Sequence, residues 1–134
     1  MKKVWVNGCF DILHRGHYEL FNYAKSLGDE LIVGIDSDEK VGKDKGPDRP
    51  YNKLEDRVYA LESLRAVDKV YVFDSREHLE WLVEKEKPDY LVVGSDWKNK
   101  EIVGGNSAKK IVYFNRIGDY STTNILTNDR EQVI

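Results

Sequence analysis

The chain has one cysteine, three prolines and no apolar run long enough to span a bilayer. A single cysteine cannot form an internal disulfide, so no disulfide framework holds the fold together. A membrane-spanning helix needs about 18 consecutive apolar residues, whereas 34% of the residues here are charged. The start, MKKVWVNGCF, is also too polar for a secretory signal. These absences predict a cytoplasmic protein that does not enter a membrane.

Neither sign of charge predominates in the sequence. Lys and Arg number 21 against 24 Asp and Glu, which gives a formal net charge of −3, and both signs are mixed along the chain. This pattern is not that of a general nucleic-acid binder. At 134 residues, the chain has the length of one domain and can bury well over half of the surface that its unfolded form exposes. We therefore expect residues 1–134 to form one domain with one core.

Short apolar runs rich in Val, Ile and aromatic residues alternate with stretches of helical period, which are typical of strands and helices respectively. The expected strands are Val4–Val6, Leu31–Ile35, Val70–Phe73, Tyr90–Val93 and Ile111–Phe114. The expected helices are centred on residues 20–27, 54–64 and 79–83. This alternation predicts an α/β class of fold: a single-domain, Rossmann-like, doubly wound sheet of five parallel strands with helices on both faces.

Two features separate the second strand from the helix that follows it. The segment Glu39–Arg49, EKVGKDKGPDR, is polar, glycine-bearing and rich in lysine, which is typical of a mobile functional loop. We expect this loop to close over bound phosphates. Asn52, with Glu55 three residues later, matches a capping box at the start of the next helix.

The segment NGCFDILHRGH, residues 7–17, follows the first strand and contains a candidate phosphate site. Ligands of an open parallel sheet bind beyond the carboxyl ends of its strands. His14 and His17 lie three residues apart at a helix start, so their imidazoles face the same way, and Gly16 leaves room for a ligand to approach. The helix start itself favours an anion. The pattern predicts imidazoles that donate hydrogen bonds to phosphate oxygens as negative charge develops on them.

Two other interpretations of these histidines stay open at this point. A bare pair of histidines at this spacing also occurs by chance on protein surfaces. Cys9, His14 and His17 are also candidate zinc ligands, although a clear fourth ligand is missing.

A second candidate anion site follows the fifth strand, in RIGDYSTT, residues 116–123. Ser121 is a plausible N-cap, and three hydroxyl residues in a row open a short helix whose start favours an anion. Arg116 adds a forked positive charge that suits phosphate oxygens. Taken alone, the hydroxyl residues are typical of a simple helix cap. Two helix-start sites at strand ends together favour a bound triphosphate.

The segments GCFDILHRGH and YSTTN resemble the cytidylyltransferase-like superfamily, which carries an HxGH motif. The resemblance covers nearly the whole chain. It implies an enzyme that transfers a nucleoside monophosphate from ATP or CTP to a small phosphorylated sugar or polyol and releases pyrophosphate. It also implies a homodimer without nucleic-acid or membrane partners.

Two small families within this superfamily fit the length and motifs. The nucleotidyltransferase domain of ADP-heptose synthase is similar, in order and spacing, to NGCFDILH, RPYNKLEDR, LRAVD, PDYLVVGSDWKNKEIVGG and YSTTNI. Glycerol-3-phosphate cytidylyltransferase is similar in its GxFDLLHxGH pattern and in Asp96-Trp97 and Arg116. More pieces match the first family, so D-glycero-beta-D-manno-heptose 1-phosphate with ATP is the first expectation. Glycerol 3-phosphate, or another polyol phosphate, with CTP is the alternative.

The resemblance implies a role for each matching residue. The implied catalytic residues are His14, His17 and Lys45. The implied nucleotide-binding residues are Gly8, Cys9, Phe10, Gly16, Arg116, Tyr120, Ser121, Thr122 and Thr123. The implied substrate-binding residues are Asp11, Lys43, Arg57, Arg65, Asp96 and Trp97. Mg²⁺ is implied as a cofactor held mainly by the triphosphate, so no protein ligand for a metal is expected.

Two other classes of protein compete with an enzyme. A regulatory domain could retain the fold and the nucleotide without turnover, but the intact HRGH segment, the loop lysines and the STT segment favour catalysis. A receiver-like signalling domain would need an acidic cluster after the first strand, where this sequence has two histidines.

Overall fold

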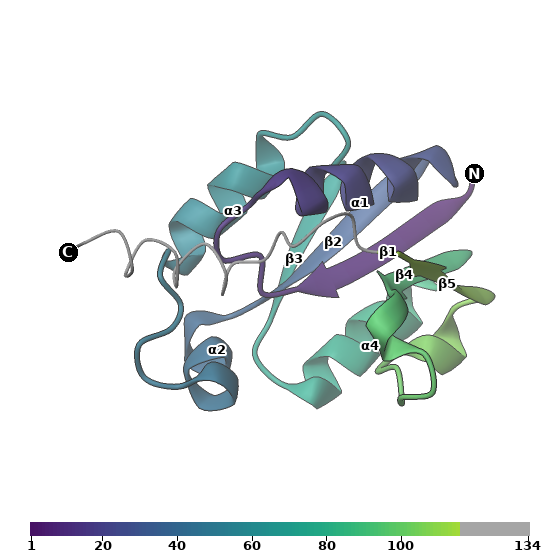
Figure 1. Cartoon of the computed structure of the whole chain (residues 1–134). Coiled ribbons are helices and arrows are strands. Elements are labelled where there is room, and N and C mark those ends of the chain that lie inside the picture. Colours follow the sequence, from purple (N-terminus) through teal and green to yellow (C-terminus); the bar gives the residue numbers. More distant parts are fainter. Residues whose placement is uncertain (116–134) are drawn as a thin grey trace.

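The computed structural model describes residues 1–115 of the chain, which form one five-stranded parallel sheet flanked by helices (Figure 1). The strands are β1 (Lys3–Gly8), β2 (Glu30–Asp36), β3 (Lys69–Phe73), β4 (Tyr90–Gly94) and β5 (Lys110–Phe114). Their order in the sheet is β3-β2-β1-β4-β5, and every neighbouring pair is parallel. The five expected strands and the parallel sheet are confirmed.

The helices between these strands lie on both faces of the sheet. They are α1 (Arg15–Ser26), α2 (Asp38–Lys45), α3 (Leu54–Glu62) and α4 (Arg76–Glu86), with short 3-10 turns η1 (Ser95–Trp97) and η2 (Gly105–Ser107). Figure 1 shows α1 and α3 on one face and α4 on the other. The doubly wound arrangement is therefore confirmed. Within residues 1–115, no helix is long and apolar enough to cross a bilayer.

The two faces of the sheet have separate apolar cores, and β1 contributes to both. Val4 and Val6 pack with Phe21 of α1, whereas Trp5 packs with Leu82 of α4. Adjacent side chains on a strand point to opposite faces, so a strand covered on both sides is apolar at successive positions. This requirement explains the continuous apolar runs in the sequence.

The strand order reverses at β1. The chain runs from β1 to β2 on one side and later returns to place β4 on the other side. Connections therefore leave the carboxyl ends of β1 and β4 in opposite directions, which opens a crevice at this point of the sheet. The fold thus brings the segment after β1 and the segment after β4 to the same place.

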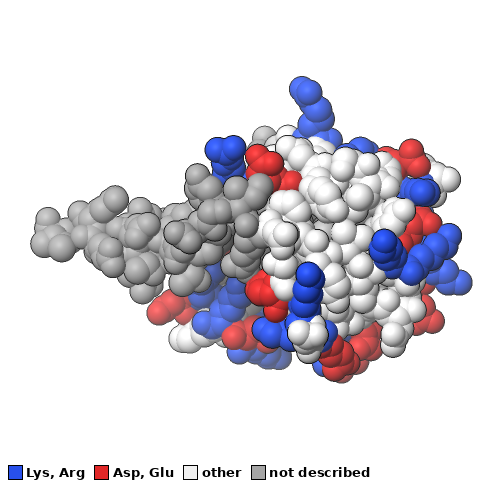
Figure 2. Space-filling model, turned by 45° about the vertical axis from the view of Figure 1, so that its right-hand side comes forward, with Lys and Arg blue, Asp and Glu red and all other residues white. Residues whose placement is uncertain are grey.

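The charge pattern of the sequence is also visible on the surface. In Figure 2, Lys, Arg, Asp and Glu side chains intermingle around the rim of one face, while uncharged side chains occupy much of its centre. The mixed signs along the sequence therefore remain mixed in space on this face.

The segment Glu39–Arg49 is not a loop throughout, so this expectation is wrong. Its first part belongs to α2, where the hydroxyl of Ser37 caps the helix by accepting a hydrogen bond from Lys40 N at 3.2 Å. Val41 is buried and anchors the helix to the core. Acidic residues in the first turn and lysines in the last turn also complement the helix dipole. One apolar anchor and these end charges stabilise a short helix that the polar sequence did not predict.

The expected capping box at Asn52 is also wrong. Helix α3 begins at Leu54, and its N-cap residue, Lys53, makes no side-chain capping bond. Asn52 instead binds Asp11: its backbone N–H donates to the carboxylate and its side-chain amide donates to the backbone carbonyl. The tertiary contact with Asp11 has replaced the local one.

Arg57 of α3 is fully buried beneath the carboxyl ends of β1 and β2. Its Nη1 donates to the carbonyls of Cys9 at 3.0 Å and Asp36 at 2.8 Å, and its Nε donates to the carbonyl of Asn52 at 3.0 Å. Its Nη2 lies 2.7 Å from a carboxylate oxygen of Asp38. A buried charge is tolerated when its donors are paired in this way. The side chain has no exposed surface, so the expected contact between Arg57 and substrate is corrected to a structural role.

Replacing Arg57 with alanine should destabilise the fold strongly, because it leaves buried carbonyls without their donor. We expect the free energy of unfolding to fall by about 3 to 5 kcal/mol. Urea denaturation at 25 °C measures this change. Arg65→Ala is the matched control, since Arg65 is exposed and its removal should cost less than about 0.5 kcal/mol. Equal losses in the two variants would contradict the structural role.

The ion pair of Asp38 with Arg57 should make stability depend on pH. Burial alone would raise the pKa of Asp38, but the hydrogen bonds from Arg57 and the Leu54 backbone, with the charge of Arg57, lower this pKa below its ordinary value of 3.8. A depressed folded-state pKa adds stability above that ordinary value, and this stability is lost as the pH falls through the folded-state pKa. The wild type should therefore lose more stability than Asp38→Asn when urea denaturation is repeated from neutral pH to below about pH 4.

Candidate active site

A cavity of about 750 Å³ opens at the carboxyl ends of the strands, where the strand order reverses. Its walls come from the connection between β1 and α1, from α2, and from the end of β4 with η1. Sequence-predicted residues that line it are Gly8, Cys9, Phe10, Asp11, His14, Gly16, His17, Lys45, Asp96 and Trp97. The fold thus brings these residues, far apart in the sequence, into one place.

Other predicted residues lie elsewhere. Lys43 of α2 is exposed, pairs with Glu39 at 3.3 Å and does not line the cavity. Arg65 is exposed and precedes β3, so it lies at the amino edge of the sheet, opposite the cavity. Neither Arg65 nor Lys43 therefore lies at the cavity, and their contact with substrate stays a prediction. Five predicted residues lie outside the described part of the chain: Arg116, Tyr120, Ser121, Thr122 and Thr123.

His14 and His17 together cap the start of α1. His14 Nδ1 accepts a hydrogen bond from Gly16 N at 3.1 Å, and His17 Nδ1 accepts one from His14 N at 3.3 Å. Two imidazoles thus form a capping box, in place of the usual hydroxyl and carboxylate. Their ring centroids are 3.9 Å apart, with 30° between the ring planes. Because each Nδ1 accepts a backbone proton, the neutral ring carries its own hydrogen on Nε2.

This geometry decides what the histidines can do. Both rings line the cavity and are only partly exposed, unlike incidental surface histidines. Since Nδ1 accepts a hydrogen bond at the helix start, the donor of each neutral ring is Nε2–H. Zinc finds no support, because residues 1–115 contain no group of three His, Cys, Asp or Glu side chains that could hold a metal ion.

Phe10 supports the histidines from below. Its ring contacts the His17 ring edge to face, with centroids 5.4 Å apart, and packs against Phe21 in the core at 5.1 Å. Phe10 has a backbone φ of 47°, a value that residues other than glycine rarely adopt. Gly8 makes room for this ring, since a Cβ at Gly8 would lie 3.0 Å from it. The two residues thus link the core to the position of the imidazoles.

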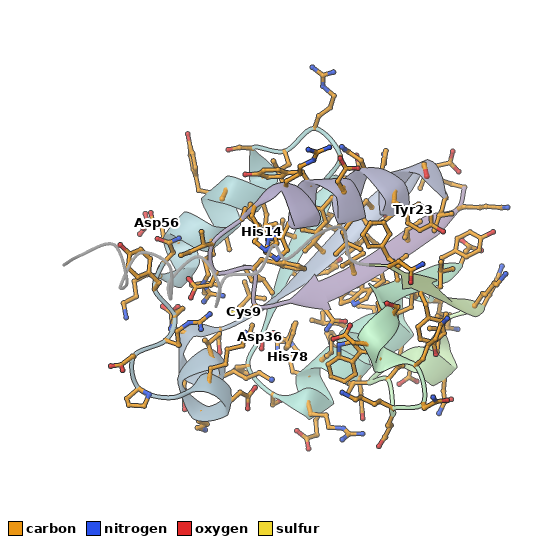
Figure 3. The ribbon with its side chains drawn as sticks, viewed as in Figure 1. Cys9, His14, Tyr23, Asp36, Asp56 and His78 are labelled. Carbon is orange, nitrogen blue, oxygen red and sulfur yellow. The ribbon has the colours of Figure 1, made fainter. Side chains whose placement is uncertain are left out.

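Cys9 does not act as a nucleophile here. Burial raises the pKa of its thiol, more than the charges of Lys45 and Arg57 lower it. The thiol is therefore neutral at pH 7, whereas the thiolate is the reactive form. Figure 3 shows Cys9 near the end of β1, in the region between His14 and Asp36.

One wall of the cavity is charged and was not predicted from the sequence; it is formed by Asp36, Lys40 and Asp44. Lys40 Nζ lies 2.6 Å from a carboxylate oxygen of Asp44 and 3.4 Å from one of Asp36. Burial raises the pKa of Asp36, and although burial alone would lower the pKa of Lys40, the two carboxylates raise it. Lys40 and Asp44 are four residues apart, a spacing that places side chains on one face of a helix. This spacing could have indicated their ion pair only if α2 had been predicted.

The two lysines of α2 that line the cavity, Lys40 and Lys45, differ in their ion pairs. Lys40 is offset by two carboxylates, whereas Lys45 makes no ion pair with any residue of the described part of the chain. The charge of Lys45 is therefore open to an anion in the cavity.

Asp11 is buried and anchors the connection between α2 and α3. Its carboxylate accepts hydrogen bonds from the backbone N–H groups of Tyr51 and Asn52, both at 2.7 Å, and from Arg49 Nε at 3.1 Å. Arg49 also lines the cavity and was not predicted. Asp11 thus holds the connection in place.

Taken together, the cavity presents two imidazoles, a helix start and the Lys45 ammonium to an anionic ligand. This set suits the binding and transfer of phosphoryl groups. The cytidylyltransferase-like family model matches residues 5–131, and the chain belongs to this family. It is therefore a nucleotidyltransferase by class.

The similar curated proteins make this assignment more particular. The chain is 48% identical over 127 residues to the "Bifunctional protein HldE" of a Nitratiruptor species, which covers 95% of this chain and 27% of that protein. It is 46% identical over 125 residues to the protein of the same name from Helicobacter hepaticus, covering 93% and 26%. The chain thus spans about a quarter of the length of these relatives.

Solved structures share the fold. The lipopolysaccharide core biosynthesis protein from Thermoplasma volcanium superimposes with a TM-score of 0.67 at 25% identity, covering 90% of this chain and 99% of that one. Pantothenate synthetase from Thermus thermophilus has a TM-score of 0.68 at 14% identity, covering 98% and 64%. The second likeness concerns the fold alone.

Substitutions at His14 should separate its capping role from its role in turnover. Asparagine is a good N-cap residue that has no imidazole. The free energy of unfolding of His14→Asn should therefore lie within a few tenths of a kcal/mol of the wild-type value, while that of His14→Ala should be lower by about 1 kcal/mol. Both variants should release pyrophosphate at least about 100-fold more slowly, because each lacks the Nε2–H donor. Urea denaturation and a pyrophosphate-release assay provide the two measurements. An active His14→Asn variant would show that the residue only caps the helix.

Proposed function

We propose that residues 1–134 form a nucleotidyltransferase domain that transfers AMP from ATP to D-glycero-beta-D-manno-heptose 1-phosphate and releases pyrophosphate. The observation that carries this proposal is the pair of capping imidazoles, which line the same cavity as Lys45. The choice of acceptor is supported by the relatives named HldE and by the resemblance to ADP-heptose synthase.

The chemistry needs no covalent bond to the protein. A phosphate oxygen of the acceptor attacks the α-phosphorus of the nucleotide, a new P–O bond forms, and the bond from the α-phosphorus to the bridging oxygen breaks as pyrophosphate leaves. His14 and His17 donate hydrogen bonds to oxygens that gain negative charge in the transition state. Lys45 offsets the charge of the two phosphate groups that must approach each other.

The metal that works with such a triphosphate is divalent, and we propose Mg²⁺. The described residues contain no cluster of three acidic, histidine or cysteine ligands, which fits an ion held mainly by the phosphates. Bound there, Mg²⁺ would offset charge on the leaving pyrophosphate. The family resemblance also supports a cytoplasmic homodimer without nucleic-acid or membrane partners.

A second candidate function is the transfer of CMP from CTP to glycerol 3-phosphate. The observation that favours it is the position of Asp96 and Trp97, which match that family and line the cavity. Both reactions join a phosphate monoester to an α-phosphorus, so the catalytic residues do not distinguish them. The pocket wall must do so, because a site that bonds sugar hydroxyls rejects a ligand that leaves its polar groups unpaired.

Crossing the two nucleotides with the two acceptors should separate these functions. We expect kcat/KM for ATP with heptose 1-phosphate to exceed that for CTP with glycerol 3-phosphate by about 100-fold or more, since several polar contacts would stay empty with glycerol. Pyrophosphate release under identical conditions measures all four combinations. The reverse preference would assign the glycerol phosphate reaction and make Asp96-Trp97 the better guide.

A further inference from the structure

Arg49 is held inside the cavity with part of its guanidinium unused. Its side chain is 15% exposed, and its Nε donates to the Asp11 carboxylate at 3.1 Å. Its Nη2 is buried and has no hydrogen-bond partner in the described part of the chain. Arginine stays charged at any pH that proteins meet, so this buried cationic donor has no acceptor among residues 1–115.

The Asp11 carboxylate does not accept a hydrogen bond from the unused nitrogen. One carboxylate oxygen already accepts from Asn52 N, and the other accepts from Tyr51 N and Arg49 Nε. These contacts fix the guanidinium plane without occupying Nη2. Burying such a donor without an acceptor is unfavourable, and the position becomes favourable when a ligand in the cavity supplies an oxygen.

The position of Arg49 in the chain places this donor beside another cation. Arg49 N donates to Gly46 O at 3.2 Å, which closes a turn directly after Lys45. Lys45 and Arg49 therefore both line the cavity from the end of α2 and the connection that follows it. Two neighbouring cations, one of them a planar fork, match the oxygens of a phosphate group.

We propose that Arg49 is a substrate-binding residue that binds the phosphate monoester of the acceptor through Nη2. This inference rests on the proposed function for the identity of the acceptor. The expected phosphate site at His14 and His17 follows β1, whereas Arg49 follows β2, the neighbouring strand. Arg49 is thus placed for a second phosphate, which approaches the α-phosphorus from the β2 side.

Binding of inorganic phosphate tests the site without requiring turnover. Isothermal titration should show that Arg49→Ala weakens phosphate binding by about 10-fold or more, as expected for a lost hydrogen bond to a charged group. Asn52→Ala is the matched control, because it loosens the same connection from Asp11 but removes no side chain that lines the cavity. Its affinity should stay within about 3-fold of the wild type. Equal affinities in Arg49→Ala and the wild type, or no phosphate binding by the wild type, would overturn the proposal.

Arg49→Lys decides the matter if the alanine variant does not fold. It retains a positive charge beside Asp11 but lacks Nη2, so it should fold and still bind phosphate several-fold more weakly than the wild type. Wild-type affinity in Arg49→Lys would overturn the role of Nη2.

Kinetics then separate this inference from the proposed function. For the acceptor that the wild type uses, Arg49→Ala should raise the acceptor KM by about 10-fold or more, with the nucleotide KM changed less than about 3-fold. An equal rise in both KM values, or the same change in Asn52→Ala, would assign Arg49 a structural role while the proposed function stands. Loss of phosphate binding in Arg49→Ala, together with a wild type that uses neither acceptor, would refute the proposed function and keep the phosphate site.

Discussion

The architecture of the site depends on one buried charge, the guanidinium of Arg57. It joins the ends of β1 and β2, the start of α2 and the connection before α3 through hydrogen bonds to Cys9, Asp36, Asp38 and Asn52. Each of these segments carries or adjoins residues of the cavity. A buried charge is costly unless its donors are paired, so these backbone segments must meet at one point. The shape of the cavity therefore depends on Arg57, a residue that is too deeply buried to contact a ligand.

Asp11 holds a second set of segments together, on the side of the site that lines the cavity. Arg57 gathers the backbone from beneath, while the Asp11 carboxylate holds the connection that follows α2 and fixes the guanidinium plane of Arg49. Lys45, Arg49 and the two histidines consequently face one cavity from different segments. Preorganised donors of this kind favour a transition state because they need no rearrangement as charge develops.

The class of reaction and the choice of substrate rest on different parts of the molecule. The capping imidazoles and Lys45 suit any phosphate monoester that attacks an α-phosphorus. Under the proposed function, discrimination between acceptors falls to the other residues that line the cavity, which include Asp36, Lys40, Asp44 and the residues after β4. These side chains offer hydrogen bonds of both kinds, so the acceptor that pairs them best is the one that the domain selects.

The sequence by itself determined the five parallel strands, the main helices and the positions of His14 and His17, because apolar period and a motif beside a strand end are local signals. It did not reveal α2, whose stability comes from Val41 and end charges, or the cap of α3, since Asn52 binds Asp11 in preference. The sequence also did not reveal the roles of Arg57, Arg65 and Arg49. An arginine in a sequence has no direction, and only the tertiary structure decided which guanidinium is buried, which faces solvent and which enters the cavity. That decision belongs to the folded chain because burial and pairing depend on segments that are distant in sequence and meet only in space.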